Sequence, residues 1–141
     1  MLKKSVLIGT TLTILSFPLF ANADLITKNT TTNEWSSVVV TSVSPPRCSG
    51  QAGGITNPNS TLVTSTTQVQ ALCSHTPCVA NILMAKDQTS AKNCNGSSII
   101  IGTAVLNNLT TDVVLQKDIN VTNSSYSVVS NDSNTIIISK K

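Results

Sequence analysis

The sequence predicts an all-β protein, a two-sheet antiparallel sandwich of the Ig-like kind with about seven strands. Short runs rich in Val, Ile and Thr alternate with turns rich in Asn, Ser, Gly and Pro. No segment shows the period of an amphipathic helix of three turns. Four cysteines follow an apparent secretory leader, which predicts two disulfides. A small β-barrel is the alternative architecture.

Residues 1–23 have the three parts of a bacterial signal peptide. Two lysines precede an apolar run at 6–20, and the motif Ala21-Asn22-Ala23 follows. The run is shorter than the roughly twenty apolar residues that a membrane-spanning helix needs. We therefore expect cleavage between Ala23 and Asp24, a secreted or periplasmic location, and no transmembrane segment in the mature chain.

The N-terminal half of the mature chain is predicted to hold two strands and a long loop. Residues 24–33 are mostly polar and are expected to form a flexible segment before a single disulfide-bonded domain at 34–141. The β-branched run at 35–43 predicts the first strand, and the alternation at 61–72 predicts the second. Between them, paired prolines and glycines predict a loop at 44–59.

The C-terminal half holds the most apolar segments. Residues 78–85 and 98–106 are short and β-branched, which predicts two central strands. A turn is expected at 107–112 and a further strand at 113–119. The final prediction is a hairpin whose strands, 126–129 and 135–139, are joined by a polar turn at 131–134.

The four cysteines allow three disulfide pairings. Cys78 begins one predicted strand and Cys94 precedes the next, so a hairpin favours Cys78–Cys94 and leaves Cys48–Cys73. A zinc site built from cysteines and His75 is the alternative, but its spacing is not that of a zinc finger. An oxidising compartment also disfavours thiolate ligands, so we expect no metal.

Charge and aromatic content exclude several functions. The formal charge of +3 includes two lysines of the leader, so the mature chain is nearly neutral and has no basic footprint for nucleic acid. Only Trp35 and Tyr126 remain as aromatic residues after the leader, too few to provide stacking platforms for sugars or bases. The terminal pair Lys140-Lys141 is expected to be a solvated tail.

The sequence shows no recognisable set of catalytic residues. His75 is the only histidine, and the acidic residues are scattered among predicted turns. Asp118-x-Asn120-x-Thr122 resembles the start of a calcium loop but lacks the glycine and the closing glutamate. We therefore expect no enzyme, no catalytic residue and no cofactor, with a small secreted hydrolase as an alternative.

The favoured function is a non-catalytic protein-binding or cell-surface interaction module with an unidentified protein partner. Loops carry binding residues on rigid sandwiches, so the candidate binding loop is the 44–59 segment with Arg47, Gln51, Asn57 and Asn59. The composition also resembles that of bacterial fimbrial and adhesin subunits, which are low in charge and rich in Thr, Ser and Asn. A structural subunit of that kind is the alternative, although its donor-strand mechanism requires an apolar N-terminal extension.

Overall fold

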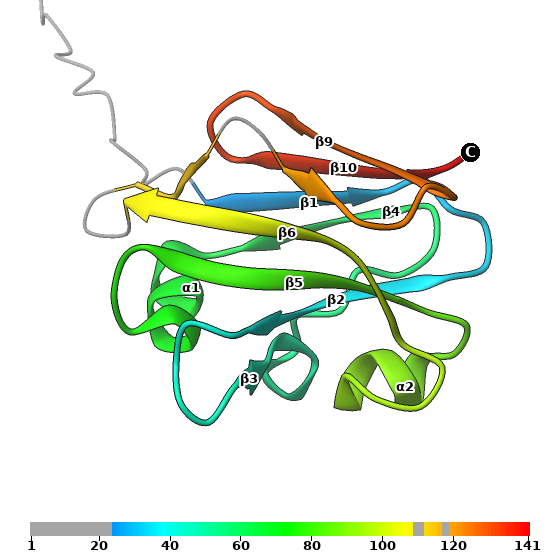
Figure 1. Ribbon diagram of the computed structural model, residues 1–141, viewed down its shortest axis with the longest axis horizontal. Coiled ribbons are helices and arrows are strands. Elements are labelled where there is room, and N and C mark those ends of the chain that lie inside the picture. The colour runs from blue at the N-terminus through cyan, green and yellow to red at the C-terminus, as the bar shows by residue number, and fades with distance from the viewer. Residues whose placement is uncertain (1–23, 109–111, 117–118) are drawn as a thin grey trace, which may run out of the picture.

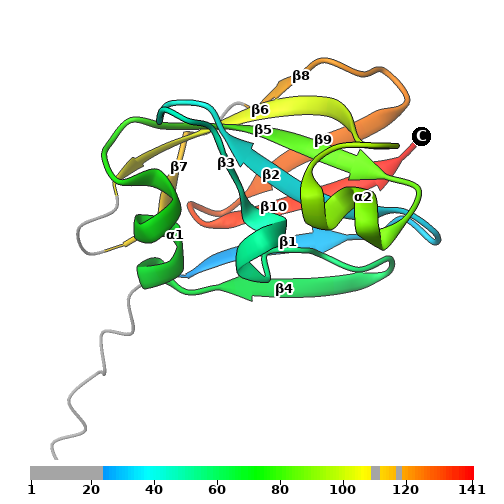
Figure 2. The ribbon, with the colours of Figure 1, turned by 90° about the horizontal axis from the view of Figure 1, so that it is seen from below.

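The computed structural model describes residues 24–108, 112–116 and 119–141. The predicted leader at 1–23 and Asp118 of the calcium-like pattern lie outside the described residues. Two β-sheets pack face to face, and two short helices lie beside them (Figures 1 and 2). The all-β sandwich is therefore confirmed, and the sheets remain open where the alternative had them closed into a barrel.

The smaller sheet has four strands, in the spatial order β4 (Ser60–Thr64), β1 (Leu25–Asn29), β10 (Thr135–Lys140) and β9 (Tyr126–Asn131). Its pairs are antiparallel except for β1 and β10, which run parallel. The larger sheet follows the order β3 (Arg47–Cys48), β2 (Trp35–Val40), β5 (Cys78–Ala85), β6 (Ile99–Asn108) and β7 (Val114–Leu115), and β8 (Asn120–Val121) pairs with β6. Short strands such as β3 and β8 raise the number above the seven that were predicted.

The apolar C-terminal half forms the strands that its composition predicts. β5 occupies the predicted range, and β6 pairs with it antiparallel from Met84↔Ile99 to Cys78↔Leu106. β6 runs on into the predicted turn as far as Asn108. The hairpin of β9 and β10 is confirmed, and its turn follows Asn131. Of the predicted strand at 113–119, the described part contains only β7.

The predicted strand at 61–72 is wrong in its second half, because β4 is followed by the helix α1 (Thr66–Cys73). Ser65 and Gln68 form a capping box, in which each side chain bonds the backbone N–H of the other residue. The buried residues Val69 and Cys73 are four positions apart, so they share one face of the helix. A helix N-terminus was thus present in a stretch that also alternates like a strand.

The flexible segment predicted at 24–33 is also wrong, because Leu25–Asn29 forms β1 with a hydrogen-bonded neighbour on each side. Asn29 is buried, yet its side-chain amide donates to the carbonyls of Glu34 and Thr56. Its side-chain oxygen accepts from the backbone N–H and the hydroxyl of Thr31. Since a buried polar group is tolerated when it is fully hydrogen-bonded, a polar segment can lie inside the sheet.

The core lies between the sheets and consists mainly of aliphatic side chains. Tyr126 is buried in it, whereas Trp35 is half-buried. The fully buried side chains of Ile82, Met84 and Ile101 come from the larger sheet, and Ile138 comes from the smaller one. α1 covers the side of the sandwich near β4, while the second helix, α2 (Gln88–Asn93), lies near the far end of β5 (Figure 2).

Candidate functional site

Both cystines differ from the predicted pairing. The disulfides are Cys48–Cys94 and Cys73–Cys78, with Cα–Cα distances of 5.9 and 5.5 Å. The prediction placed Cys78 beside Cys94, but in an antiparallel hairpin the first residue of one strand faces the end of the next. Cys78 accordingly lies opposite Leu106. Because all four sulfurs are in disulfides, none is a free thiolate for the zinc alternative.

The Cys48–Cys94 disulfide ties the 44–59 segment to the end of α2. This segment was predicted to be a loop, but it contains β3, the short 3-10 helix η1 (Ser49–Ala52), and a bridge from Thr56 to Ser36 of β2. The hydroxyl of Ser49 accepts from the N–H of Val38 at 2.9 Å and donates to the carbonyl of Gly54 at 2.8 Å. The segment is therefore held against the sheet at several points.

Gly50 brings η1 into close contact with α2. A Cβ atom at this position would lie 2.5 Å from the carbonyl oxygens of Ala91 and Lys92, which belong to the backbone of α2. Only glycine allows this approach, since backbone atoms cannot rotate away as a side chain can. The close packing fixes the height of η1 above the sheet and so positions the exposed Gln51.

Arg47 anchors the other side of the segment to α1. Its Nη1 atom donates to the carbonyl oxygens of Ala71 at 2.8 Å and Leu72 at 3.3 Å, and to the hydroxyl of Ser74 at 2.7 Å. The last carbonyls of a helix have no partner within the helix and carry partial negative charge, so a guanidinium group is a favourable cap. The side chain is nevertheless exposed, and part of its donor capacity faces solvent.

Together these anchors shape an open hollow of about 620 Å³ on the surface of the domain. Its rim and floor include Pro45, Pro46, Arg47, Gln51, Leu72 and Asn93. The structure thus brings two of the predicted binding residues, Arg47 and Gln51, to one site. Among the described residues that line the hollow, Arg47 is the only one with a charged side chain.

The other two predicted residues do not line this hollow. Asn57 is exposed, and its backbone carbonyl accepts from the hydroxyl of Ser60. Asn59 has a positive φ of 50° and donates its backbone N–H to the carbonyl of Thr31. Asparagine tolerates this left-handed conformation better than most residues. Both asparagines therefore shape the turn into β4, away from the hollow.

The only histidine lies in the exposed turn between α1 and β5. The backbone N–H of His75 donates to the carbonyl of Cys73 at 2.7 Å. Within the described ranges, no three His, Cys, Asp or Glu side chains are grouped closely enough to hold a metal ion. The part of the chain that the structure describes also has no helix long and apolar enough to cross a membrane.

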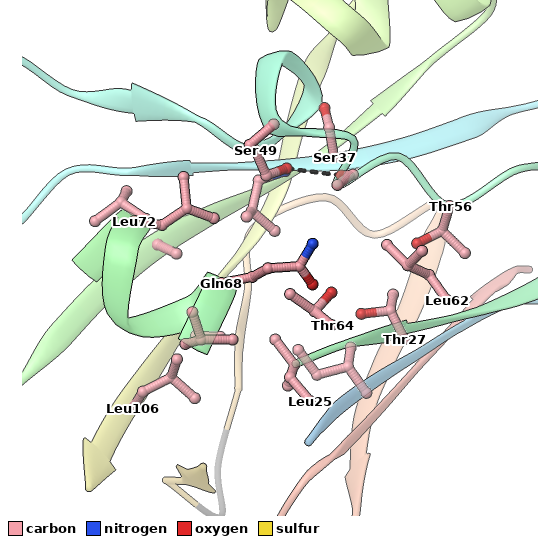
Figure 3. A pocket seen from close by; sticks show the side chains of 18 of the residues that line it. Leu25, Thr27, Ser37, Ser49, Thr56, Leu62, Thr64, Gln68, Leu72 and Leu106 are labelled. Atoms are coloured by element: carbon pink, nitrogen blue, oxygen red, sulfur yellow. Dashed lines mark hydrogen bonds between the residues drawn. The ribbon is translucent and has the colours of Figure 1, made fainter. Parts of the chain in front are cut away.

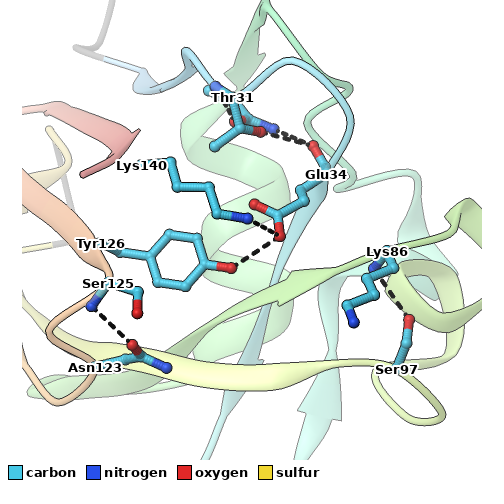
Figure 4. A network of polar contacts seen from close by, with 9 residues as sticks. Thr31, Glu34, Lys86, Ser97, Asn123, Ser125, Tyr126 and Lys140 are labelled. Atoms are coloured by element: carbon cyan, nitrogen blue, oxygen red, sulfur yellow. Dashed lines mark hydrogen bonds and ion pairs between the residues drawn. The ribbon is translucent and has the colours of Figure 1, made fainter.

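A buried carboxylate was missed by the sequence analysis. Glu34 is 5% exposed, and its Oε1 accepts from the hydroxyl of Tyr126 at 2.9 Å and from Nζ of Lys140 at 3.0 Å (Figure 4). Lys140 was expected to lie in a solvated tail, but it ends β10 and forms this ion pair. Burial, and then the hydrogen bond and negative charge of Glu34, raise the pKa of Tyr126 to about 12.

Comparisons with known proteins bear on the fold alone. No protein-family model matches the chain, and no curated protein matches it. Among solved structures, the chain is similar to the Legionella pneumophila type II secretion system substrate NttC, with a TM-score of 0.59 and 23% identity. The similarity covers 86% of this chain and 100% of that one.

Proposed function

We propose that this chain is an exported bacterial protein that acts without catalysis by binding another protein through the hollow around Arg47 and Gln51. The observation that carries the proposal is the way in which this surface is fixed. A disulfide, a buried serine hydroxyl and an arginine cap hold one exposed segment to two helices and a sheet. A surface that is already ordered loses little conformational entropy on binding.

Two further observations support export. The leader pattern at 1–23 precedes a domain in which every cysteine is in a disulfide, as is usual for proteins that fold outside the cytosol. The structural neighbour NttC is a type II secretion substrate, and it shares the fold of this domain. Export by a bacterium therefore agrees with the leader, the disulfides and the fold.

The chemistry of the hollow suits a protein segment better than a small charged ligand. Pro45, Pro46 and Leu72 offer apolar surface, and Gln51 and Arg47 offer hydrogen-bond donors at the rim. Arginine can bind carbonyl and carboxylate groups of a partner with the donors that it does not use for α1. An extended segment carrying an aliphatic residue beside an acidic one fits these groups.

The pairing of β10 makes a donor-strand subunit the weaker candidate. Donor-strand exchange leaves a vacant place beside the C-terminal strand of the subunit, which a neighbouring subunit fills. Here β10 is hydrogen-bonded to β1 on one edge and to β9 on the other. The place beside the last strand is thus taken by the chain's own N-terminal segment.

The proposal can be tested with two variants that receive the same substitution on the same segment. Gln51→Arg places a large cation in the hollow, whereas Asn57→Arg places it on an exposed residue outside. A partner is first identified by capture with the mature wild-type protein, and its Kd is then measured for all three proteins. We expect Gln51→Arg to weaken binding at least about tenfold and Asn57→Arg to change it less than about twofold.

Two results would contradict the proposal. The first is a folded Gln51→Arg variant that binds the partner as tightly as the wild type does. The second is a larger loss for Asn57→Arg than for Gln51→Arg, which would move the binding surface to the turn before β4. Circular dichroism and the melting temperature of each variant establish that the fold is retained.

A further inference from the structure

A second candidate site lies between the two sheets, and its lining shares only Ala52 and Leu72 with the surface hollow. A cavity of about 120 Å³ separates the two sheets beside α1 (Figure 3). Its lining is mainly apolar and includes Leu25, Leu62, Val69, Leu72 and Leu106. Protein interiors normally contain few voids larger than a water molecule, so a space of this size is a feature of the fold that needs a cause.

The cause lies in small side chains at neighbouring positions of the larger sheet. Ala80 of β5 pairs with Val40 of β2 and with Ala104 of β6, so a row of small residues crosses the centre of the larger sheet. All three residues line the cavity. With Trp35 and Tyr126 as the only aromatic residues after the leader, no large ring fills the space that these alanines leave.

The smaller sheet supplies both leucines and hydroxyls to the opposite wall. Leu25 pairs with Thr64, and Thr27 pairs with Leu62. Since alternate residues of a strand share a face, all four side chains lie on the same face of the smaller sheet. Figure 3 shows the Thr27 and Thr64 side chains directed into the pocket. Neither hydroxyl has a hydrogen-bond partner among the described residues, and both are half-buried.

The helix α1 adds a fixed donor. Oε1 of Gln68 accepts from the backbone N–H of Ser65 at 3.0 Å, and a backbone N–H can only donate. The capping box therefore determines which end of the carboxamide is the oxygen. Nε2, the NH₂ end, has no partner among the described residues, and the carboxamide of the solvent-exposed Gln68 projects into the pocket from α1 (Figure 3).

We propose that this cavity binds a small neutral molecule with an apolar body and one hydroxyl or carbonyl group directed at Gln68, Thr27 and Thr64. The volume is close to that of a buried apolar cavity known to take up benzene, roughly 150 Å³. No charged side chain lines the cavity, and burial of an unpaired ion is costly, so the ligand is neutral. The polar group of the ligand forms hydrogen bonds with the side chains of Gln68, Thr27 and Thr64, which would otherwise need water as their partner.

Phenol and toluene form a nearly isosteric pair of probes for this site. Both are added to the mature protein, and binding is followed through the methyl NMR signals of the wild-type protein. We expect phenol to bind with a Kd of about 1 mM or tighter, and toluene to bind at least about threefold more weakly. The shifted methyl signals should belong to Leu25, Leu62, Val69 and Leu106, which line the cavity and do not line the surface hollow.

Two variants in which leucine replaces an alanine test whether phenol binds in this cavity or elsewhere on the protein. Ala104→Leu adds a side chain to the cavity wall, whereas Ala71→Leu makes the same change on an exposed position of α1 outside it. We expect Ala104→Leu to abolish phenol binding and Ala71→Leu to leave it unchanged. In Gln68→Glu, a carboxylate oxygen keeps the capping box but Nε2 is lost, so the preference for phenol over toluene should disappear.

The inference fails if saturating phenol leaves the cavity methyl signals of the wild-type protein unmoved, or moves those of another region. It also fails if a folded Ala104→Leu variant binds phenol as the wild type does. The wild-type titration decides the question even if that variant does not fold. Neither result affects the surface hollow, because Gln51 does not line the cavity.

Discussion

The hydroxyl of Tyr126 donates a hydrogen bond of 2.9 Å to the carboxylate of Glu34, which lies 92 positions earlier in the chain. The bond joins the start of β9 to the residue before β2, and so links the two sheets. Lys140 adds an ion pair of 3.0 Å and lies over the Tyr126 ring, 5.8 Å from its centroid. Both strands of the β9–β10 hairpin thus meet one buried carboxylate from a distant part of the chain.

Tyr126→Phe should reduce the free energy of unfolding by about 2 kcal/mol, because it removes a hydrogen bond to a buried charge. The other carboxylate oxygen, Oε2, is already buried without a partner among the described residues, so Glu34 has little alternative solvation. Urea denaturation of the mature protein measures the change. Lys140→Met should cost less than about 1 kcal/mol, since the lysine side chain is 52% exposed. A larger loss for Lys140→Met than for Tyr126→Phe would contradict this ranking.

The raised pKa of Tyr126 makes the stability depend on pH in the alkaline range. The folded pKa of about 12 exceeds the ordinary value of about 10, so folding favours the neutral hydroxyl. Its contribution is fully present below about pH 10 and is lost as the pH rises towards 12. Tyr126 is the only tyrosine, so absorbance at 295 nm follows this hydroxyl alone. A titration midpoint near 10 would show that burial and Glu34 do not act on it.

The two disulfides should contribute unequally to stability. In the chain-entropy treatment, the 46-residue separation of Cys48 and Cys94 corresponds to about 4 kcal/mol, and the five-residue separation of Cys73 and Cys78 to about 2 kcal/mol. We expect Cys48→Ala/Cys94→Ala to lower the urea midpoint about twice as far as Cys73→Ala/Cys78→Ala does. Equal losses for the two double variants would mean that loop length does not govern these contributions.

Gly50→Ala should destabilise the domain by about 3 kcal/mol, because the new methyl group would collide with the backbone of α2. Gly53→Ala is the matched control. Gly53 has a φ of 80° but nothing within 4 Å of a built Cβ, so only the backbone conformation is strained there. That strain costs about 1 kcal/mol. Thermal unfolding of both variants shows which of them is less stable. If Gly50→Ala were more stable than Gly53→Ala, η1 would not be packed closely on α2.

Local sequence patterns correctly predicted those strands whose own residues favour a β-strand. β5, β6 and the β9–β10 hairpin were predicted because their residues are apolar or β-branched and are bounded by turns. α1 was missed, although Ser65 and Gln68 have the spacing of a capping box, because the alternation of the preceding residues was extended across them. The capping-box spacing was therefore visible in the sequence, but the strand-like alternation was given more weight.

Other features depend on tertiary contacts that no local pattern records. Three of the five residues of β1 are polar, and the strand is held in the sheet by pairing with β4 and with the distant β10, where Ile26 lies opposite Thr135. The ion pair of Glu34 with Lys140 joins residues 106 positions apart. Two of the four candidate binding residues, Arg47 and Gln51, lie in the hollow, but its shape depends on the Cys48–Cys94 disulfide, and the predicted pairing of these cysteines was wrong.

The premise behind the proposed function is that the chain crosses a membrane and then folds around its two disulfides. The most direct test is mass spectrometry, without reduction, of the protein exported by a bacterium that expresses the full sequence. We predict a chain that begins at Asp24 and contains crosslinked peptides for Cys48–Cys94 and Cys73–Cys78. An uncleaved chain that stays inside the cell with four free thiols would contradict the account.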